Sequence, residues 1–128
     1  VAEFGDSRST REVSFKDVPA VIGAPGVHVL DVRRTSEREA SHIEPSLHIP
    51  LHELEGRVNE LPSHGEIWVH CAGAYRAAAA LGIIENSKRT AVLINEPYDA
   101  CLRVDGLNIV TGHMDAGPVS PSDVVANV

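Results

Sequence analysis

The sequence has 128 residues, the size of one ordinary domain, and its 43% hydrophobic and 23% charged content excludes a globally disordered chain. Acidic residues number 18 against 11 lysines and arginines, so the net charge is −7 with neutral histidine. An acidic chain disfavours nucleic acid and anionic membranes as partners, and no apolar run reaches the length of a membrane span. The two cysteines cannot form a disulfide framework, and they favour a reducing, cytoplasmic location.

The composition divides the chain into three parts. Residues 1–12 are polar and small and predict a linker or a flexible N-terminus. Residues 111–128 contain prolines and glycines without a sustained period and predict a C-terminal tail. Residues 13–110 are expected to form the compact domain. The chain begins with valine rather than methionine, which suggests a processed chain or a part of a longer protein.

Within residues 13–110, short apolar runs alternate with helical patterns. The runs predict strands at residues 27–32, 47–49, 67–70 and 91–94, with a last extended piece at 107–110. Helices are predicted from a capping box at residues 36–39, over 51–61, over 76–85 and over 98–104. This alternation predicts an α/β fold with a central, mostly parallel sheet of about five strands flanked by helices.

The segment with the clearest chemistry places Cys71 where a buried strand ends and Arg76 where a helix begins. Ligands of parallel sheets bind beyond the carboxyl ends of the strands, and a loop entering a helix directs backbone N–H groups at negative charge. Ala72, Gly73 and Ala74 are small enough for the backbone to curl around the sulfur. The loop amides, the helix dipole and Arg76 would together stabilise the Cys71 thiolate. We therefore predict that Cys71 is a catalytic nucleophile rather than a small core residue.

Other candidate residues allow simpler interpretations. Asp31 and Arg33 lie on one side of their strand, where a structural ion pair is as plausible as a role in the site. His70 neighbours Cys71 but points to the opposite face of an extended strand, so it is expected to be a framework residue. Cys101 is expected to be a small buried residue rather than a resolving thiol. The histidines and cysteines show no metal-ligand spacing, so neither a metal nor an organic cofactor is expected.

At these residues the sequence resembles the rhodanese-like sulfurtransferases, over residues 14–110. The segment 30–33 (LDVR) resembles the first strand motif of that family, 42–51 resembles the segment that follows, and 69–76 (VHCAGAYR) resembles its active-site loop. The resemblance implies a rhodanese-like fold, with Cys71 as the nucleophile that forms a persulfide and Arg76 as the end of the anion cradle. It also implies a substrate-binding surface that comprises Asp31, Arg33, Ala72, Gly73, Ala74 and Tyr75.

The length of the loop favours one reaction within this fold. Residues 71–76 match the six-residue loop associated with sulfur transfer, whereas the related phosphatases and arsenate reductases have one residue more. The resemblance therefore implies transfer of a sulfane sulfur from thiosulfate or a low-molecular-weight persulfide to a thiol or cyanide acceptor. The alternative is a non-catalytic regulatory or persulfide-binding module, fused to a larger hydrolase of the metallo-β-lactamase fold.

The sequence departs from the family pattern in two places. Ser41 and the segment 44–46 (EPS) replace the usual glycines and proline around the His-Ile pair. The Gly-Gly…Trp signature after the last full strand is absent, and residues 96–101 (EPYDAC) stand in its place.

Overall fold

The computed structural model describes residues 11–73 and 75–112, so the predicted site residue Ala74 lies outside the described part of the chain. Five parallel strands form the central sheet, which confirms the predicted fold class. In spatial order they are β1 (Glu12–Val13), β6 (Thr90–Ile94), β5 (Glu66–His70), β2 (Val27–Asp31) and β4 (Leu47–His48).

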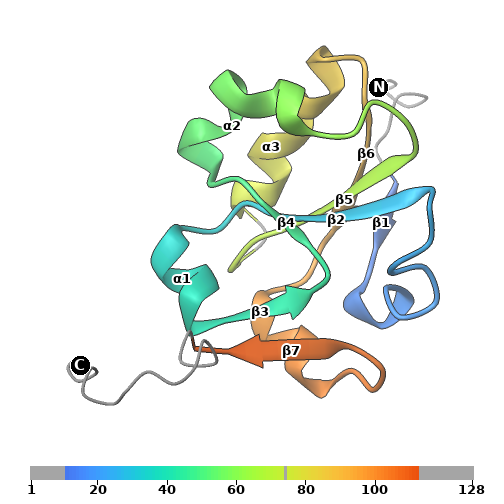
Figure 1. Ribbon diagram of the computed structural model, residues 1–128, viewed down its shortest axis with the longest axis vertical. Helices are drawn as coiled ribbons and strands as arrows, with labels where there is room; N and C mark the ends of the chain where they lie inside the picture. Colours follow the sequence, from blue (N-terminus) through green and yellow to red (C-terminus); the bar gives the residue numbers. More distant parts are fainter. Residues whose placement is uncertain (1–10, 74, 113–128) are drawn as a thin grey trace.

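Two layers cover the central sheet, as Figure 1 shows. The helices α2 (Leu51–Arg57) and α3 (Tyr75–Asn86) lie on one face, and the 3-10 helix η3 (Val58–Glu60) continues α2. The other face carries the short 3-10 helices η2 (Phe15–Asp17) and η4 (Tyr98–Arg103) together with a second, antiparallel sheet of β3 (Ser41–Glu44) and β7 (Asn108–Thr111). Helix α1 (Thr35–Ala40) connects β2 to β3.

Strand alternation sorts the core into two clusters, one on each face of the sheet. In β5, Ile67 and Val69 face α2 and α3, whereas Trp68 and His70 face η2 and η4. Two fully buried alanines, Ala77 and Ala80, let α3 lie close to the sheet. The alternation carries over to the residue after β5, so Cys71 and His70 lie in opposite layers, as the sequence predicted.

One predicted helix start is wrong by two residues. The sequence predicts Ser36 as the N-cap, but α1 begins at Thr35 and its N-cap is Arg34. The Glu37 carboxylate explains the shift, because it accepts a hydrogen bond from the Arg34 backbone N–H at 2.8 Å. The Glu37 carboxylate, which the predicted capping box placed in the first turn, therefore caps the backbone N–H of the residue before the helix.

Several short elements differ from the sequence-based expectations. Strand β1 brings Glu12, predicted to be linker, into register with Leu93, and β7 brings Thr111, predicted to be tail, into register with Ser41. The extended piece at 107–110 corresponds to β7, which pairs with β3 and not with the central sheet. The helix predicted at 98–104 is the 3-10 helix η4. Across the described residues, the structure contains no helix both long and apolar enough to span a membrane.

His70 is a fully buried histidine without a hydrogen-bond partner among the described residues at either ring nitrogen. Its ring meets Phe15 edge-on at 5.4 Å and stacks against Tyr98 at 5.8 Å between centroids. Burial lowers the pKa of His70 from 6.5 to about 4, although the nearby Asp31 carboxylate opposes this change. The imidazole is therefore neutral at physiological pH and acts as an aromatic packing group.

This burial predicts an acid sensitivity of the fold. The pKa of His70 is lower in the folded than in the unfolded state, so the unfolded state takes up the proton first and stability is lost as pH falls below 6.5. Between about pH 8 and about pH 5 the free energy of unfolding should fall by about 2 kcal/mol from this group. Urea unfolding at a series of pH values measures it. His70→Leu should remove this part of the slope, whereas the exposed control His64→Gln should keep it.

Candidate active site

Cys71 follows the last residue of β5 at the carboxyl edge of the central sheet. The Ala77 backbone N–H donates a hydrogen bond to its Sγ at 3.1 Å. Ala77 is the third residue of α3, and amides in the first turn of a helix have no partner within that helix. The geometry thus directs one helical amide at the sulfur, where the sequence predicts a cradle of several. The Cys71 side chain has no exposed surface.

The loop after Cys71 is attached to η4. The Ala72 carbonyl accepts a hydrogen bond from the Tyr98 backbone N–H at 2.8 Å. Gly73 is exposed, and a Cβ added to it would meet nothing within 4 Å. Packing against the described residues therefore does not by itself demand glycine at this position. Tyr75, the first residue of α3, leaves 88% of its surface exposed at the end of the loop.

Arg76 is held by a carboxylate that the sequence-based site did not contain. Its Nη1 and Nη2 donate hydrogen bonds to the two carboxylate oxygens of Glu37 at 2.8 and 3.0 Å. The hydrogen bonds from Arg76 lower the pKa of Glu37 to about 2. This bidentate pair joins α1 to α3 and offsets the charge of Arg76. No local pattern indicates it, because the two residues are 39 positions apart.

Asp31 and Arg33 form a buried ion pair, the structural alternative considered from the sequence. Arg33 Nε and Nη2 donate to the two carboxylate oxygens of Asp31, each at 2.9 Å. Arg33 Nη2 also donates to the Ser41 carbonyl at 2.7 Å, and the guanidinium lies 3.9 Å from the Tyr98 ring centroid. Burial alone raises the pKa of Asp31, but the hydrogen bond from Arg33 holds it below its usual value. Both side chains are thus engaged inside the protein.

A hollow of about 200 Å³ adjoins the loop. It is lined by Val32, Arg34, Pro50, Leu51, His52 and Arg76. Arg34 is a second residue that the sequence-based site did not contain. A larger hollow of about 340 Å³ is lined by residues 22–25, 27–29 and 45–47 and includes none of the loop residues. The larger hollow is therefore not the candidate site. The smaller hollow is the candidate because it lies beside the loop that carries the candidate nucleophile.

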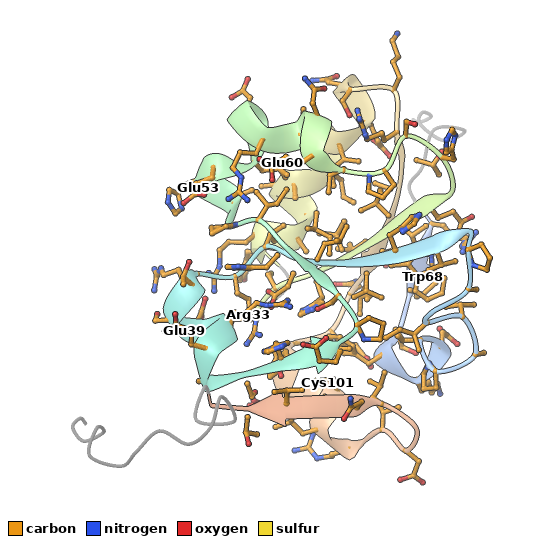
Figure 2. The ribbon with its side chains drawn as sticks, viewed as in Figure 1. Arg33, Glu39, Glu53, Glu60, Trp68 and Cys101 are labelled. Carbon is orange, nitrogen blue, oxygen red and sulfur yellow. The ribbon has the colours of Figure 1, made fainter. Side chains whose placement is uncertain are left out.

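The second cysteine is separate from this site. Cys101, labelled in Figure 2, is buried in the layer of η2 and η4, on the opposite side of the central sheet from the cluster that contains Cys71. Burial raises the pKa of the Cys101 thiol to about 11, so it stays protonated at neutral pH. Its position agrees with the expected small core residue and not with a resolving thiol.

Comparison with known proteins identifies the family. The family described as "Rhodanese-like domain" matches residues 14–102. YrkF of Bacillus subtilis (strain 168), named as a candidate sulfur carrier protein, is 43% identical over 54 residues, which make up 42% of this chain and 29% of YrkF.

Solved structures agree with this result. A rhodanese-related protein from Thermoplasma volcanium superposes with a TM-score of 0.69 at 26% identity, covering 78% of this chain and 97% of that protein. The rhodanese-like domain of the Alr3790 protein from Anabaena shares the fold at 18% identity, with a TM-score of 0.71 over 88% of this chain and 87% of that domain. The chain therefore belongs to the family of rhodanese-like domains.

Proposed function

We propose that this domain is a sulfurtransferase in which Cys71 carries a sulfane sulfur from a small donor to a thiol or cyanide acceptor. The observation that carries the proposal is the Ala77 amide at 3.1 Å from Cys71 Sγ, at the carboxyl edge of a parallel sheet. Membership of the rhodanese-like family supports sulfur transfer as the class of reaction. The six-residue length of the loop from Cys71 to Arg76 favours sulfur over the larger phosphate group.

The proposed reaction has two balanced steps. The Cys71 thiolate attacks the outer sulfur of the donor, the S–S bond of the donor breaks, and its remainder leaves with the bonding electron pair. A Cys71 persulfide results. An acceptor thiolate or cyanide then attacks the outer sulfur of this persulfide, and Cys71 leaves as a thiolate. The Ala77 N–H stabilises negative charge on Sγ before the first step and after the second.

A second candidate is a regulatory or persulfide-binding module within a larger protein. The observation that favours it is the complete burial of Cys71, because a donor reaches the sulfur only if the loop or a neighbouring side chain moves. The two candidates differ in turnover. A carrier module would load one sulfur and hold it, whereas an enzyme would release it repeatedly to an acceptor.

Substitution of the nucleophile tests the proposal. Cys71→Ser should reduce multiple-turnover transfer from a persulfide donor to cyanide to the uncatalysed background, because a hydroxyl cannot form the persulfide. Cys101→Ala is the matched control and should keep the activity, since that thiol lies in the other layer. Thermal unfolding of both variants checks that the fold persists. Transfer by Cys71→Ser at the unmodified rate would contradict the assignment.

The charges around the loop predict a preference among donors. Thiosulfate is a dianion, but Glu37 offsets the charge of Arg76 and Arg33 is engaged by Asp31, so Arg34 is the one arginine beside the loop without an ion pair among the described residues. We therefore expect a lower kcat/KM for thiosulfate than for a low-molecular-weight persulfide such as glutathione persulfide, which can also contact the exposed Tyr75 ring.

The matched variants for this prediction both lie on α1. Glu37→Gln should raise kcat/KM for thiosulfate by freeing the charge of Arg76. Glu39→Gln makes the same charge change at an exposed position on α1, where Figure 2 labels it, and should leave kcat/KM unchanged. Steady-state kinetics at fixed ionic strength measure all three proteins. A tenfold advantage of thiosulfate over the persulfide in the unmodified protein, about 1.4 kcal/mol, would contradict the expectation.

A further inference from the structure

Two residues that line the hollow beside the loop are connected to neighbours of the candidate nucleophile. The Val32 backbone N–H, in one wall, donates to the His70 carbonyl at 3.1 Å, immediately before Cys71. Arg76, in the other wall, precedes Ala77, whose amide donates to Cys71 Sγ. The hollow therefore lies beside the segment that carries Cys71, although Cys71 itself is buried and is not part of its lining.

The charge in the hollow comes mainly from Arg34. Of the basic residues that line it, Arg76 is paired with Glu37, and His52 Nε2 lies 3.3 Å from the Glu53 carboxylate. Arg34 takes part in none of the ion pairs found among the described residues, and its side chain is exposed. Its guanidinium is thus the group in this hollow whose charge is not offset by an ion pair in the described part of the chain.

The neighbouring arginines do not offer the same group. Arg33 is 4% exposed and is bonded to Asp31 and to the Ser41 carbonyl. Arg103 lies on η4 and is not part of the lining of the hollow. Arg34 is therefore the arginine that can receive an anionic group next to the loop.

The size and walls of the hollow limit what it can hold. Pockets for drug-sized ligands measure roughly 300–1,000 Å³, and this hollow of about 200 Å³ accepts only one end of such a molecule. Val32, Pro50 and Leu51 provide an apolar wall for one or two methylene groups. A planar guanidinium binds a carboxylate with two parallel hydrogen bonds.

We propose that this hollow is a subsite for the carboxylate end of a low-molecular-weight thiol or its persulfide, and that Arg34 is its charged contact. The proposal rests on the proposed sulfur transfer at Cys71 and adds a chemical class for the substrate: a thiol with a carboxylate two or three carbons from its sulfur. Arg34 acts in binding and takes no part in the reaction of the sulfur.

Two acceptors that differ only in charge test this subsite. 3-Mercaptopropionate carries the carboxylate, and 3-mercaptopropanamide replaces it by a neutral amide of nearly the same shape. The unmodified protein should show a higher kcat/KM for the acid, compared at equal thiolate concentration. Arg34→Gln should lower the acid-to-amide ratio about fivefold, the effect of one exposed ion pair. Arg103→Gln, with the same loss of charge outside the hollow, should leave the ratio unchanged. An equal ratio in Arg34→Gln and unmodified protein would overturn the proposal.

A binding measurement separates this subsite from the proposed reaction. The unreactive thioethers 3-(methylthio)propionate and 3-(methylthio)propanamide are titrated into Cys71→Ser, and NMR follows the Arg34 and Arg76 side-chain Nε–H signals. The acid should bind more tightly than the amide, and Arg34→Gln in the same background should remove the difference. If the acid binds more tightly than the amide but the protein with Cys71 intact transfers no sulfur, the proposed reaction is rejected and the subsite is kept. Equal binding of acid and amide would reject the subsite whatever the transfer assay shows.

Discussion

The buried ion pair between Asp31 and Arg33 fixes the carboxyl edge of the central sheet, and the candidate site depends on that edge. Asp31 ends β2 and is in register with both His70 in β5 and His48 in β4. Arg33 binds the Ser41 carbonyl of β3 and lies over the Tyr98 ring, and the Tyr98 amide in turn binds the loop after Cys71. Removing one partner of such a pair leaves an uncompensated buried charge, at a cost of roughly 3–5 kcal/mol. A charged pair thus connects both sheets to the loop.

The alternation of β5 assigns separate tasks to two adjacent residues. Cys71 faces the layer of α2 and α3, where a helical amide meets its sulfur. His70 faces the layer of η2 and η4, where burial keeps the imidazole neutral between aromatic rings. The histidine beside the candidate nucleophile therefore lies on the wrong side of the sheet to act as its base. In this arrangement the group placed at the Cys71 sulfur is the Ala77 backbone amide and not a neighbouring imidazole.

The sequence predicts well what local pattern determines. The buried strands β2, β5 and β6 are continuous apolar runs, and the position of Cys71 follows from the end of such a run before an alanine-rich helix. The short strands β1 and β3 form through pairing with distant segments, so no local period marks them, and the pairing of β7 with β3 is equally invisible in the local pattern that predicts its extended backbone. The same reason hides the contact between Glu37 and Arg76, which joins two helices far apart in the chain. The part of the site that controls charge is therefore visible only in the folded structure.

Intact-protein and peptide mass spectrometry after incubation with a persulfide donor, in the absence of acceptor, tests the central claim most directly. The account predicts that the peptide containing Cys71 gains the mass of one sulfur atom and loses it when an acceptor thiol is added. The peptide containing Cys101 should stay unchanged, because that thiol is buried in the other layer with a raised pKa. An unmodified Cys71 under conditions in which the protein still transfers sulfur would contradict the account.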